Sequence, residues 1–280
     1  IYNYRELRQT LAADGFACRG ASDTEVVLRA FERWGDSCVD RLRGMFAFAV
    51  WNPRTGTLLA ARDRLGIKPL YYRWTAGTLT FASELKAILA ADPDVAARLD
   101  PYSFDRYLPL QYVPAPYTMV TGVRQLMPGC TLTLSTEGRP VERRYWQARA
   151  TACGPQTVDD FQERLAEVVR SHLAADVPVG ALLSGGLDSS LVVSHMVRAS
   201  SGPVHTFSVG FEDAHLDERR AARSVADHLG TVHHEQVVTD ADAADVLPGL
   251  VARMDEPLAD YAALPTFLIS RFAAQHVKVV

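Results

Sequence analysis

The spacing of apolar side chains in the first half of the chain predicts one helix and several short strands. Residues 24–34 repeat apolar positions at helical spacing, and Ser22 or Asp23 is placed to cap that helix. Apolar runs bounded by turn residues predict strands at 45–51, 57–63, 78–84 and 131–135. Consecutive strands joined by tight turns pair antiparallel, so this half predicts helices with an antiparallel sheet.

The second half shows a different rhythm, in which apolar runs alternate with helical patterns. Strands are predicted at 179–183, 204–210 and 232–238, and helices at 159–175, 188–200, 217–229, 242–254 and 262–275. This alternation is typical of a parallel α/β sheet covered by helices. The closing apolar run at 277–280 is expected to be a further buried strand of that sheet.

The composition between the two halves is that of irregular structure and a linker. Residues 109–129 are rich in proline and are predicted to be irregular, and a small, polar stretch lies further along. We therefore expect domains at 1–147 and 159–280, joined by a linker at 148–158. Because the chain opens at Ile1 and closes inside an apolar run, we also expect it to be part of a longer protein.

Composition and charge exclude several classes of protein. Hydrophobic residues make up 48% and charged residues 22%, which excludes a disordered chain, a collagen-like chain and a disulfide-stapled miniprotein. The apolar runs are far shorter than the roughly 20 residues that span a bilayer, so no membrane partner is expected. The net charge of −4 is well mixed along the chain, so no nucleic-acid partner is expected. The cysteines form no CxxC pair, which favours reduced thiols in a cytoplasmic protein: Cys18, Cys38, Cys130 and Cys153.

The strongest chemical signal is the sequence SGGLDSS at 184–190, between a predicted strand and a predicted helix. Two glycines let the backbone approach a ligand closely, and free N–H groups at a helix start suit a phosphate. The serines add hydroxyl groups, and Asp188 adds a carboxylate that can hold Mg²⁺ against phosphates. The plain alternative is a glycine turn with a capping serine. The Walker pattern GxxxxGK[ST] is absent from the sequence.

This loop resembles the pyrophosphate loop of the ATP pyrophosphatases, which adenylate a substrate. Several segments of the first half resemble the class II glutamine amidotransferase domain: IYNYRELR (1–8), SDTEVVL (22–28), RGMFAFAVW (43–51), ARDRLGIKPLYY (61–72) and FASELKAIL (81–89). Further segments resemble asparagine synthetases: 112–129, TFSVGFED (206–213), HLGTVHHE (228–235) and MDEPLADYAALPT (254–266). The chain is thus identified as a member of the glutamine-hydrolysing asparagine synthetase family.

The resemblance implies a fold and a set of site residues. It implies an α+β domain of antiparallel sheets with helices, like the N-terminal-nucleophile hydrolases, followed by an α/β parallel-sheet domain like the adenine-nucleotide alpha hydrolases. The family's cysteine nucleophile falls upstream of Ile1, so no catalytic residue is expected in this chain. Asp23 matches the carboxylate that grips the α-ammonium of glutamine, with a plain helix cap as its alternative. The ATP site is expected at Leu182, Leu183, Ser184, Gly185, Gly186, Asp188, Ser189, Ser190, Val209 and Gly210, with Asp188 also holding Mg²⁺.

Other polar residues carry weaker expectations. Arg62 and Asp63 are expected to organise the first domain internally rather than to touch substrate. The acidic residues Asp255, Glu256 and Asp260 either assist the ATP site or form a solvated turn. His233 and His234 are not expected to share a metal ion, because adjacent strand residues point to opposite faces. These histidines are therefore left out of the expected site.

The activity implied by the resemblance is glutamine-dependent amide ligation. An acceptor, most often aspartate, attacks ATP to give β-aspartyl-AMP and pyrophosphate, and ammonia from glutamine then displaces AMP. Tyr261 stands where some asparagine synthetases carry an arginine, so an acceptor of another kind, cell-surface or secondary-metabolite, is an alternative. The rivals are an amidotransferase making phosphoribosylamine or glucosamine phosphate, which has no need of SGGLDSS, and an inactive nucleotide-binding module. The expected partners are these small molecules and a second copy in a homodimer.

Overall fold

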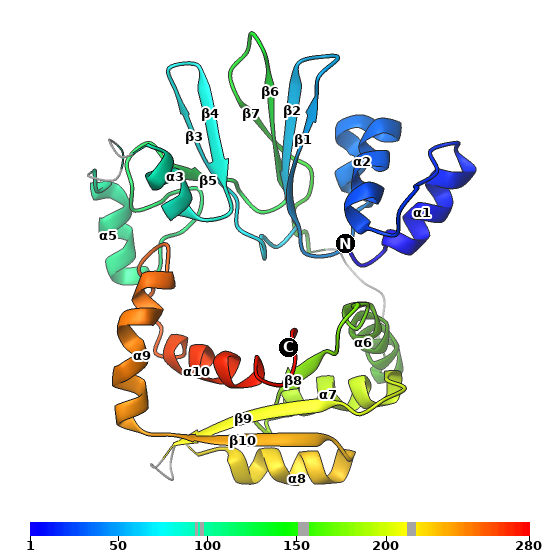
Figure 1. Ribbon diagram of the computed structural model, residues 1–280, viewed down its shortest axis with the longest axis vertical. Coiled ribbons are helices and arrows are strands. Elements are labelled where there is room, and N and C mark those ends of the chain that lie inside the picture. Colours follow the sequence, from blue (N-terminus) through cyan, green and yellow to red (C-terminus); the bar gives the residue numbers. More distant parts are fainter. Residues whose placement is uncertain (93–94, 96–97, 151–156, 212–216) are drawn as a thin grey trace. The chain divides into compact units, whose positions relative to one another are not determined.

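The chain folds into two compact units, each with its own core (Figure 1). The computed structural model describes residues 1–92, 95, 98–150, 157–211 and 217–280. The first unit comprises Ile1–Thr151 with Asp255–Ala259, and the second comprises Ala152–Met254 with Asp260–Val280. The linker expected at 148–158 falls largely on residues outside the described part.

Antiparallel strands and helices build the first unit. Its helices are α1 (Tyr4–Ala13), α2 (Asp23–Trp34), the 3-10 helix η1 (Gly35–Arg41), α3 (Leu85–Ala91) and α5 (Pro101–Leu110). Its strands are β1 (Ala47–Asn52), β2 (Thr57–Arg62), β3 (Tyr71–Thr75), β4 (Thr78–Ala82), β5 (Arg124–Gln125), β6 (Cys130–Ser135) and β7 (Val141–Arg144). They form two sheets, in the orders β1-β2-β6-β7 and β4-β3-β5, and all of their pairings are antiparallel.

The first unit is layered, and the alternation of side chains along its strands explains the layers. Leu59 and Ala61 of β2 pack in one core with α1 and α2, whereas Ala60 between them faces the second sheet. In β3, Tyr72 joins the core between the sheets and Tyr71 packs with α3 on the other side. The order of layers is therefore helices, sheet, sheet and helix, as the upper part of Figure 1 shows.

The structure corrects the predicted strands of the first half. The expected antiparallel sheets are confirmed, but the apolar runs missed the strands β3, β5 and β7 that complete them. Strand β3 does not show the alternation of apolar and polar side chains that predicts a strand, because Tyr71 and Tyr72 face different cores and both are buried. Helix α5 runs to Leu110, so Pro109 lies inside a helix and not in the irregular segment.

The second unit is a parallel α/β layer structure, which confirms the prediction for this half. Its strands, in the order β10-β9-β8, all pair parallel. The strands are β8 (Gly180–Leu182), β9 (His205–Phe211) and β10 (Val232–Val238). The helices are α6 (Val158–His172), α7 (Leu187–Ala199), α8 (Arg219–Leu229), α9 (Asp240–Arg253) and α10 (Ala263–Ala273).

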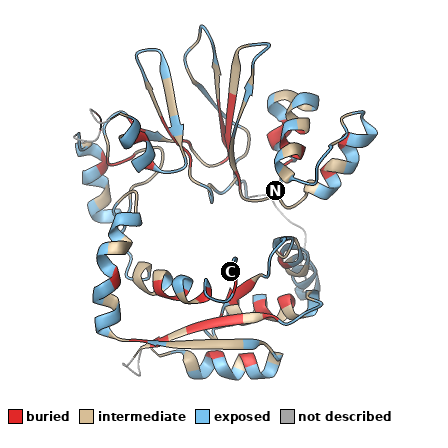
Figure 2. Ribbon diagram, in the orientation of Figure 1, coloured by how far each residue is buried: buried red, intermediate tan, exposed pale blue. Residues whose placement is uncertain are grey.

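Helices cover both faces of this sheet. Helices α6, α7 and α8 share one core with β8, and α10 packs on the other face against Phe207 of β9. Figure 2 shows the middle strand β9 as largely buried, and Phe207 is completely so. Near the end of the chain, Val279 forms a parallel bridge with Val179. Among the described residues, no helix has both the length and the apolar character needed to cross a bilayer.

Candidate functional site

The glycine loop of the second unit joins a strand to a helix, as its sequence predicts. Strand β8 ends at Leu182 and α7 begins at Leu187, so the loop lies at the carboxyl end of a parallel strand. Ligands of open α/β sheets bind at that end of the strands. Gly185 has a φ of +79°, a backbone conformation that favours glycine.

The serine hydroxyls of the loop hold its shape. The Oγ of Ser184 accepts a hydrogen bond from the N–H of Gly186 at 3.2 Å and lies 3.0 Å from the Oγ of Ser189. Ser190 Oγ donates to the carbonyl of Gly186 at 2.7 Å. The N-cap Gly186 has no side chain to accept from the first turn of α7, so the N–H groups there remain available to an anion.

Asp188 lies in the first turn of α7 and is exposed, so its carboxylate is free to meet a ligand at the loop. A carboxylate beside phosphate oxygens is the usual donor set for Mg²⁺. No group of three or more histidine, cysteine, aspartate or glutamate residues able to hold a metal occurs in the described part of the chain. A metal ion here would therefore take most of its ligands from a nucleotide and from water.

The remaining residues expected at the ATP site differ in whether their side chains are exposed or buried. Leu182 is partly exposed, but the side chain of Leu183 is buried in the core, so only its backbone could meet a ligand. Val209 packs in the cores on the α10 face. Gly210 is buried beneath the side chain of Arg219 on the opposite face. Both lie before the end of β9, which runs on to Phe211.

His233 and His234 lie on opposite faces of β10, as expected. His233 approaches Thr206 and Ser208, whereas His234 stacks against His205 and His276 on the α10 face. The rings of His234 and His276 lie 4.1 Å apart between centroids. Desolvation, with the neighbouring histidine rings, lowers the pKa of His234.

Asp23 lies at the start of α2, but it is not the cap of that helix. The side chain of Ser22 accepts the hydrogen bond from the N–H of Thr24 at 3.1 Å, which leaves Asp23 free for another role. Its Oδ2 accepts a hydrogen bond from the amino group of Ile1 at 2.7 Å, and its side chain is 48% exposed. Asp23 borders a cavity of about 880 Å³ that is also lined by β1, Lys68 and Ser83.

Arg62 and Asp63 organise the first unit from within, which confirms the expectation from sequence. The guanidinium of Arg62 donates to the carbonyls of Lys68, Leu126 and Gly66. The carboxylate of Asp63 accepts from backbone N–H groups of the same loop, including that of Lys68 at 2.9 Å. Both side chains are buried, so neither is available to a substrate.

Asp255 and Glu256 belong to the first unit, whereas Asp260 is exposed in the second unit, where it accepts from the N–H of Ala262 at 2.8 Å. Asp255 accepts from the N–H of Leu85 at 2.9 Å, at the start of α3. Glu256 accepts from the N–H of Met119 at 2.7 Å, and burial raises its pKa to about 7, with the charge of Asp255 adding to the effect. The reading as a solvated turn is therefore wrong for these two carboxylates, which accept backbone hydrogen bonds within the first unit. No periodicity in the sequence signals this docking.

Comparison with known proteins follows the same division of the chain. The family model described as glutamine amidotransferase domain matches residues 1–146, and the one described as asparagine synthase matches residues 160–280. Asparagine synthetase [glutamine-hydrolyzing] 1 of Bacillus subtilis is 36% identical over all of this chain and 44% of its own length. The putative asparagine synthetase [glutamine-hydrolyzing] of Mycobacterium bovis is 39% identical over all of this chain and 44% of its own.

A third relative, the putative asparagine synthetase [glutamine-hydrolyzing] 2 of Methanocaldococcus jannaschii, is 32% identical over all of this chain and 55% of its own length. The chain therefore spans about half the length of the curated relatives that it matches. Both family models match in the order that the two units follow along the sequence. On this evidence, the chain belongs to the glutamine-hydrolysing asparagine synthetase family.

Proposed function

We propose that this chain is the part of a glutamine-dependent amide ligase that binds glutamine in its first unit and ATP in its second. The protein that carries it forms asparagine from aspartate, with release of AMP and pyrophosphate. The observation that carries the proposal is the glycine loop at 184–190, set between β8 and α7 in the part of the chain that matches asparagine synthase. The proposed domains are 1–147 and 159–280.

In the second unit, the phosphates of ATP bind the N–H groups at the start of α7, where the helix dipole favours an anion. Gly185 and Gly186 let these phosphates approach the backbone, and the internal bonds of Ser184, Ser189 and Ser190 keep the loop in shape. Asp188 is the residue that would hold Mg²⁺, and the ion would supply positive charge for the pyrophosphate leaving group. The backbone of Leu182, Leu183, Val209 and Gly210 borders the nucleoside, because β8 and β9 are neighbouring parallel strands.

The chemistry divides into two balanced steps. A carboxylate oxygen of the acceptor attacks the α-phosphorus of ATP, the bond to pyrophosphate breaks, and an acyl-AMP forms. Ammonia then attacks the acyl carbon, AMP leaves with the electron pair, and the ammonia nitrogen loses a proton. In the first unit, Asp23 grips the α-ammonium of the glutamine that supplies the ammonia, which is supported by its half-exposed carboxylate at the edge of the cavity beside β1.

Nucleotide binding by the 280-residue chain tests the ATP site directly. Calorimetry with ATP and Mg²⁺ is expected to show binding that Asp188→Asn weakens by about tenfold, because a ligand of the metal is lost. Asp176→Asn is the matched control, since Asp176 is exposed in the turn before β8. Absence of ATP binding, or equal losses in both variants, would contradict the proposal.

The acceptor is tested in the protein that carries this chain. Aspartate-dependent formation of AMP and pyrophosphate in the presence of glutamine or ammonia supports asparagine synthesis. If AMP forms only with another carboxylate, that carboxylate replaces aspartate as the acceptor, and the proposed ligase reaction stands. We place this reaction in the cytoplasm and in a homodimer, and the mass of the protein in solution checks the second of these.

A further inference from the structure

The backbone of the glycine loop rests directly on helix α8. A Cβ built on Gly185 would lie 2.5 Å from the carbonyl carbon of Ala221 and 2.5 Å from the nitrogen of Ala222. No side chain separates the two backbones at this point, because Gly185 has none. The position of the loop therefore depends on where the first turns of α8 lie.

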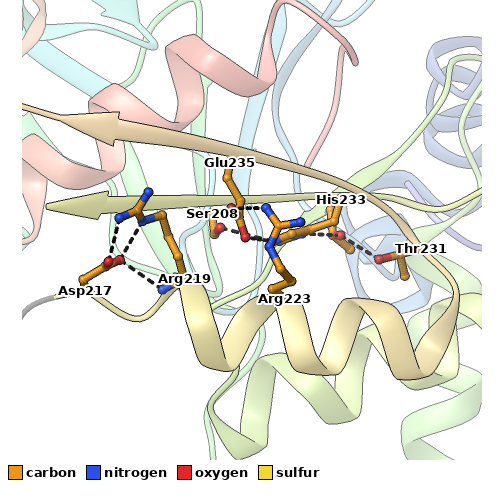
Figure 3. A network of polar contacts seen from close by, with 8 residues as sticks. Ser208, Asp217, Arg219, Arg223, Thr231, His233 and Glu235 are labelled. Carbon is orange, nitrogen blue, oxygen red and sulfur yellow. Dashed lines mark hydrogen bonds and ion pairs between the residues drawn. The ribbon is translucent and has the colours of Figure 1, made fainter. Parts of the chain in front are cut away.

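Two arginines hold these first turns of α8, one on each side of Ala221 and Ala222. Arg219 donates to both carboxylate oxygens of Asp217, from Nε at 2.8 Å and from Nη2 at 2.7 Å. Its side chain covers Gly210 near the carboxyl end of β9. One turn further on, Arg223 pairs with Glu235 of β10 (Figure 3). The helix is thus tied to β10 by the ion pair of Arg223, while the side chain of Arg219 packs over Gly210 of β9.

Glu235 is the better buried partner of the second tie. Its side chain is only 14% exposed, while that of Arg223 is 60% exposed. Among the described residues its buried Oε1 has no hydrogen-bond partner, and Nε2 of His233 lies 3.2 Å from it. Desolvation lowers the pKa of His233, which favours its neutral form. Arg223 therefore supplies the positive charge that a buried carboxylate requires.

A row of polar side chains holds the ring of His233, which lies next to the carboxylate of Glu235. The Nδ1 of His233 lies 2.9 Å from Thr206 Oγ1, and its Nε2 lies 3.3 Å from Ser208 Oγ. Thr206 Oγ1 in turn lies 2.9 Å from Thr231 Oγ1. These residues share the face of β9 and β10 that α8 covers. Glu235 therefore lies beside a hydrogen-bonded row of side chains and contacts α8 through its ion pair with Arg223.

We propose that Glu235 and Arg223 are positioning residues for the glycine loop: their ion pair sets the place of α8, on which the backbone of Gly185 rests. The inference deepens the proposed function, because the loop positioned in this way is the proposed phosphate site. Loss of the pair lets the first turns of α8 shift, and the N–H groups at the start of α7 no longer hold the geometry that a triphosphate needs. The pair touches no substrate itself.

Hydrogen exchange of the 280-residue protein without nucleotide tests the inference. In Glu235→Gln and in Arg223→Gln, exchange of the amides at 184–190 is expected to rise about tenfold, while amides of β6 in the first unit serve as an internal reference. The double variant is expected to match Glu235→Gln and to be less perturbed than Arg223→Gln, because only Arg223→Gln leaves the buried carboxylate without a cation. Arg223→Lys keeps the charge and is expected to restore most of the protection.

Arg220→Gln is the matched control, because Arg220 is exposed on the same turn of α8. The ATP dissociation constant is expected to rise about tenfold in the two single variants and to stay unchanged in this control. Unchanged loop exchange, additive effects in the double variant, or an equal rise in exchange throughout β8 and β9 would each overturn the inference. If the loop behaves as expected but the parent chain binds no ATP, the positioning role stands and the proposed function fails.

Discussion

Substitution of Glu256 by glutamine probes the segment that returns to the first unit after about a hundred residues in the second. Glu256 is partly buried there and accepts a hydrogen bond from the N–H of Met119 at 2.7 Å. Burial is the main reason that its pKa rises from 4.5 to about 7. A glutamine side chain keeps an acceptor oxygen for Met119 and carries no charge, so Glu256→Gln removes the titration and keeps the shape.

The direction of the pH dependence follows from proton binding. The folded unit holds the proton of Glu256 up to about pH 7, whereas the unfolded chain releases it near pH 4.5. The stability that this carboxyl contributes is therefore complete below about pH 4.5 and is lost as the pH rises to about 7. An interval of about 2.5 pH units at 1.36 kcal/mol each gives a loss of about 3 kcal/mol, an upper value because the side chain is not fully buried.

Tryptophan fluorescence isolates the unit in question. All of the tryptophans, at positions 34, 51, 74 and 146, lie in the first unit, so their emission follows its unfolding alone. Urea unfolding between pH 5 and 8.5 is expected to show that Glu256→Gln is more stable than the parent chain at pH 8, by up to about 3 kcal/mol, and loses this advantage towards pH 5.

A matched control separates burial from the loss of a charge. Glu84→Gln changes an exposed carboxylate in the same neighbourhood, which pairs with Lys86 at 3.1 Å. Its unfolding free energy is expected to run parallel to that of the parent chain at every pH, because exposed pairs contribute little. Parallel curves for Glu256→Gln and the parent chain would refute the reasoning.

Three further predictions concern other parts of the molecule. Gly185→Ala places a Cβ 2.5 Å from the backbone of α8 at a φ of +79°, so thermal unfolding should show a loss of about 3 kcal/mol and calorimetry a loss of ATP binding. Asp23→Asn in the full-length protein should raise the KM for glutamine by about tenfold or more and leave ammonia-dependent synthesis unchanged, and equal losses in both assays would exclude the binding role. His234→Gln should make the second unit less sensitive to acid. The pKa of His234 is lowered in the folded unit, so below pH 6.5 the unfolded chain binds a proton more readily there and the folded unit loses stability. Pulse-labelled exchange of β9 and β10 amides at pH 7.5 and 5.5 measures this difference.

Local patterns in the sequence were enough to predict the architecture of the second unit. Each of its strands and helices begins within a few residues of the predicted position, because apolar runs of a parallel sheet alternate with amphipathic helices. The loop at 184–190 was equally readable, since its glycines and its place between strand and helix are local features. The resemblance to a known family rests on the same short segments.

The first unit shows where local patterns stop being informative. Periodicity assumes that a strand has one buried face, but Tyr71 and Tyr72 of β3 are both buried, in cores on opposite sides of one sheet. The choice between Ser22 and Asp23 as the cap of α2 was also open in the sequence. The structure decided it through a single hydrogen bond to the N–H of Thr24.

The sequence by itself therefore determined the two kinds of sheet, the phosphate-type loop and the family. Only the tertiary structure decided the roles of isolated polar residues such as Glu256, Glu235 and His233. Their partners lie on other elements, at Met119, Arg223 and Thr206. The physical reason is that burial and charge pairing depend on which distant segments the fold brings together, and no spacing along the chain encodes that.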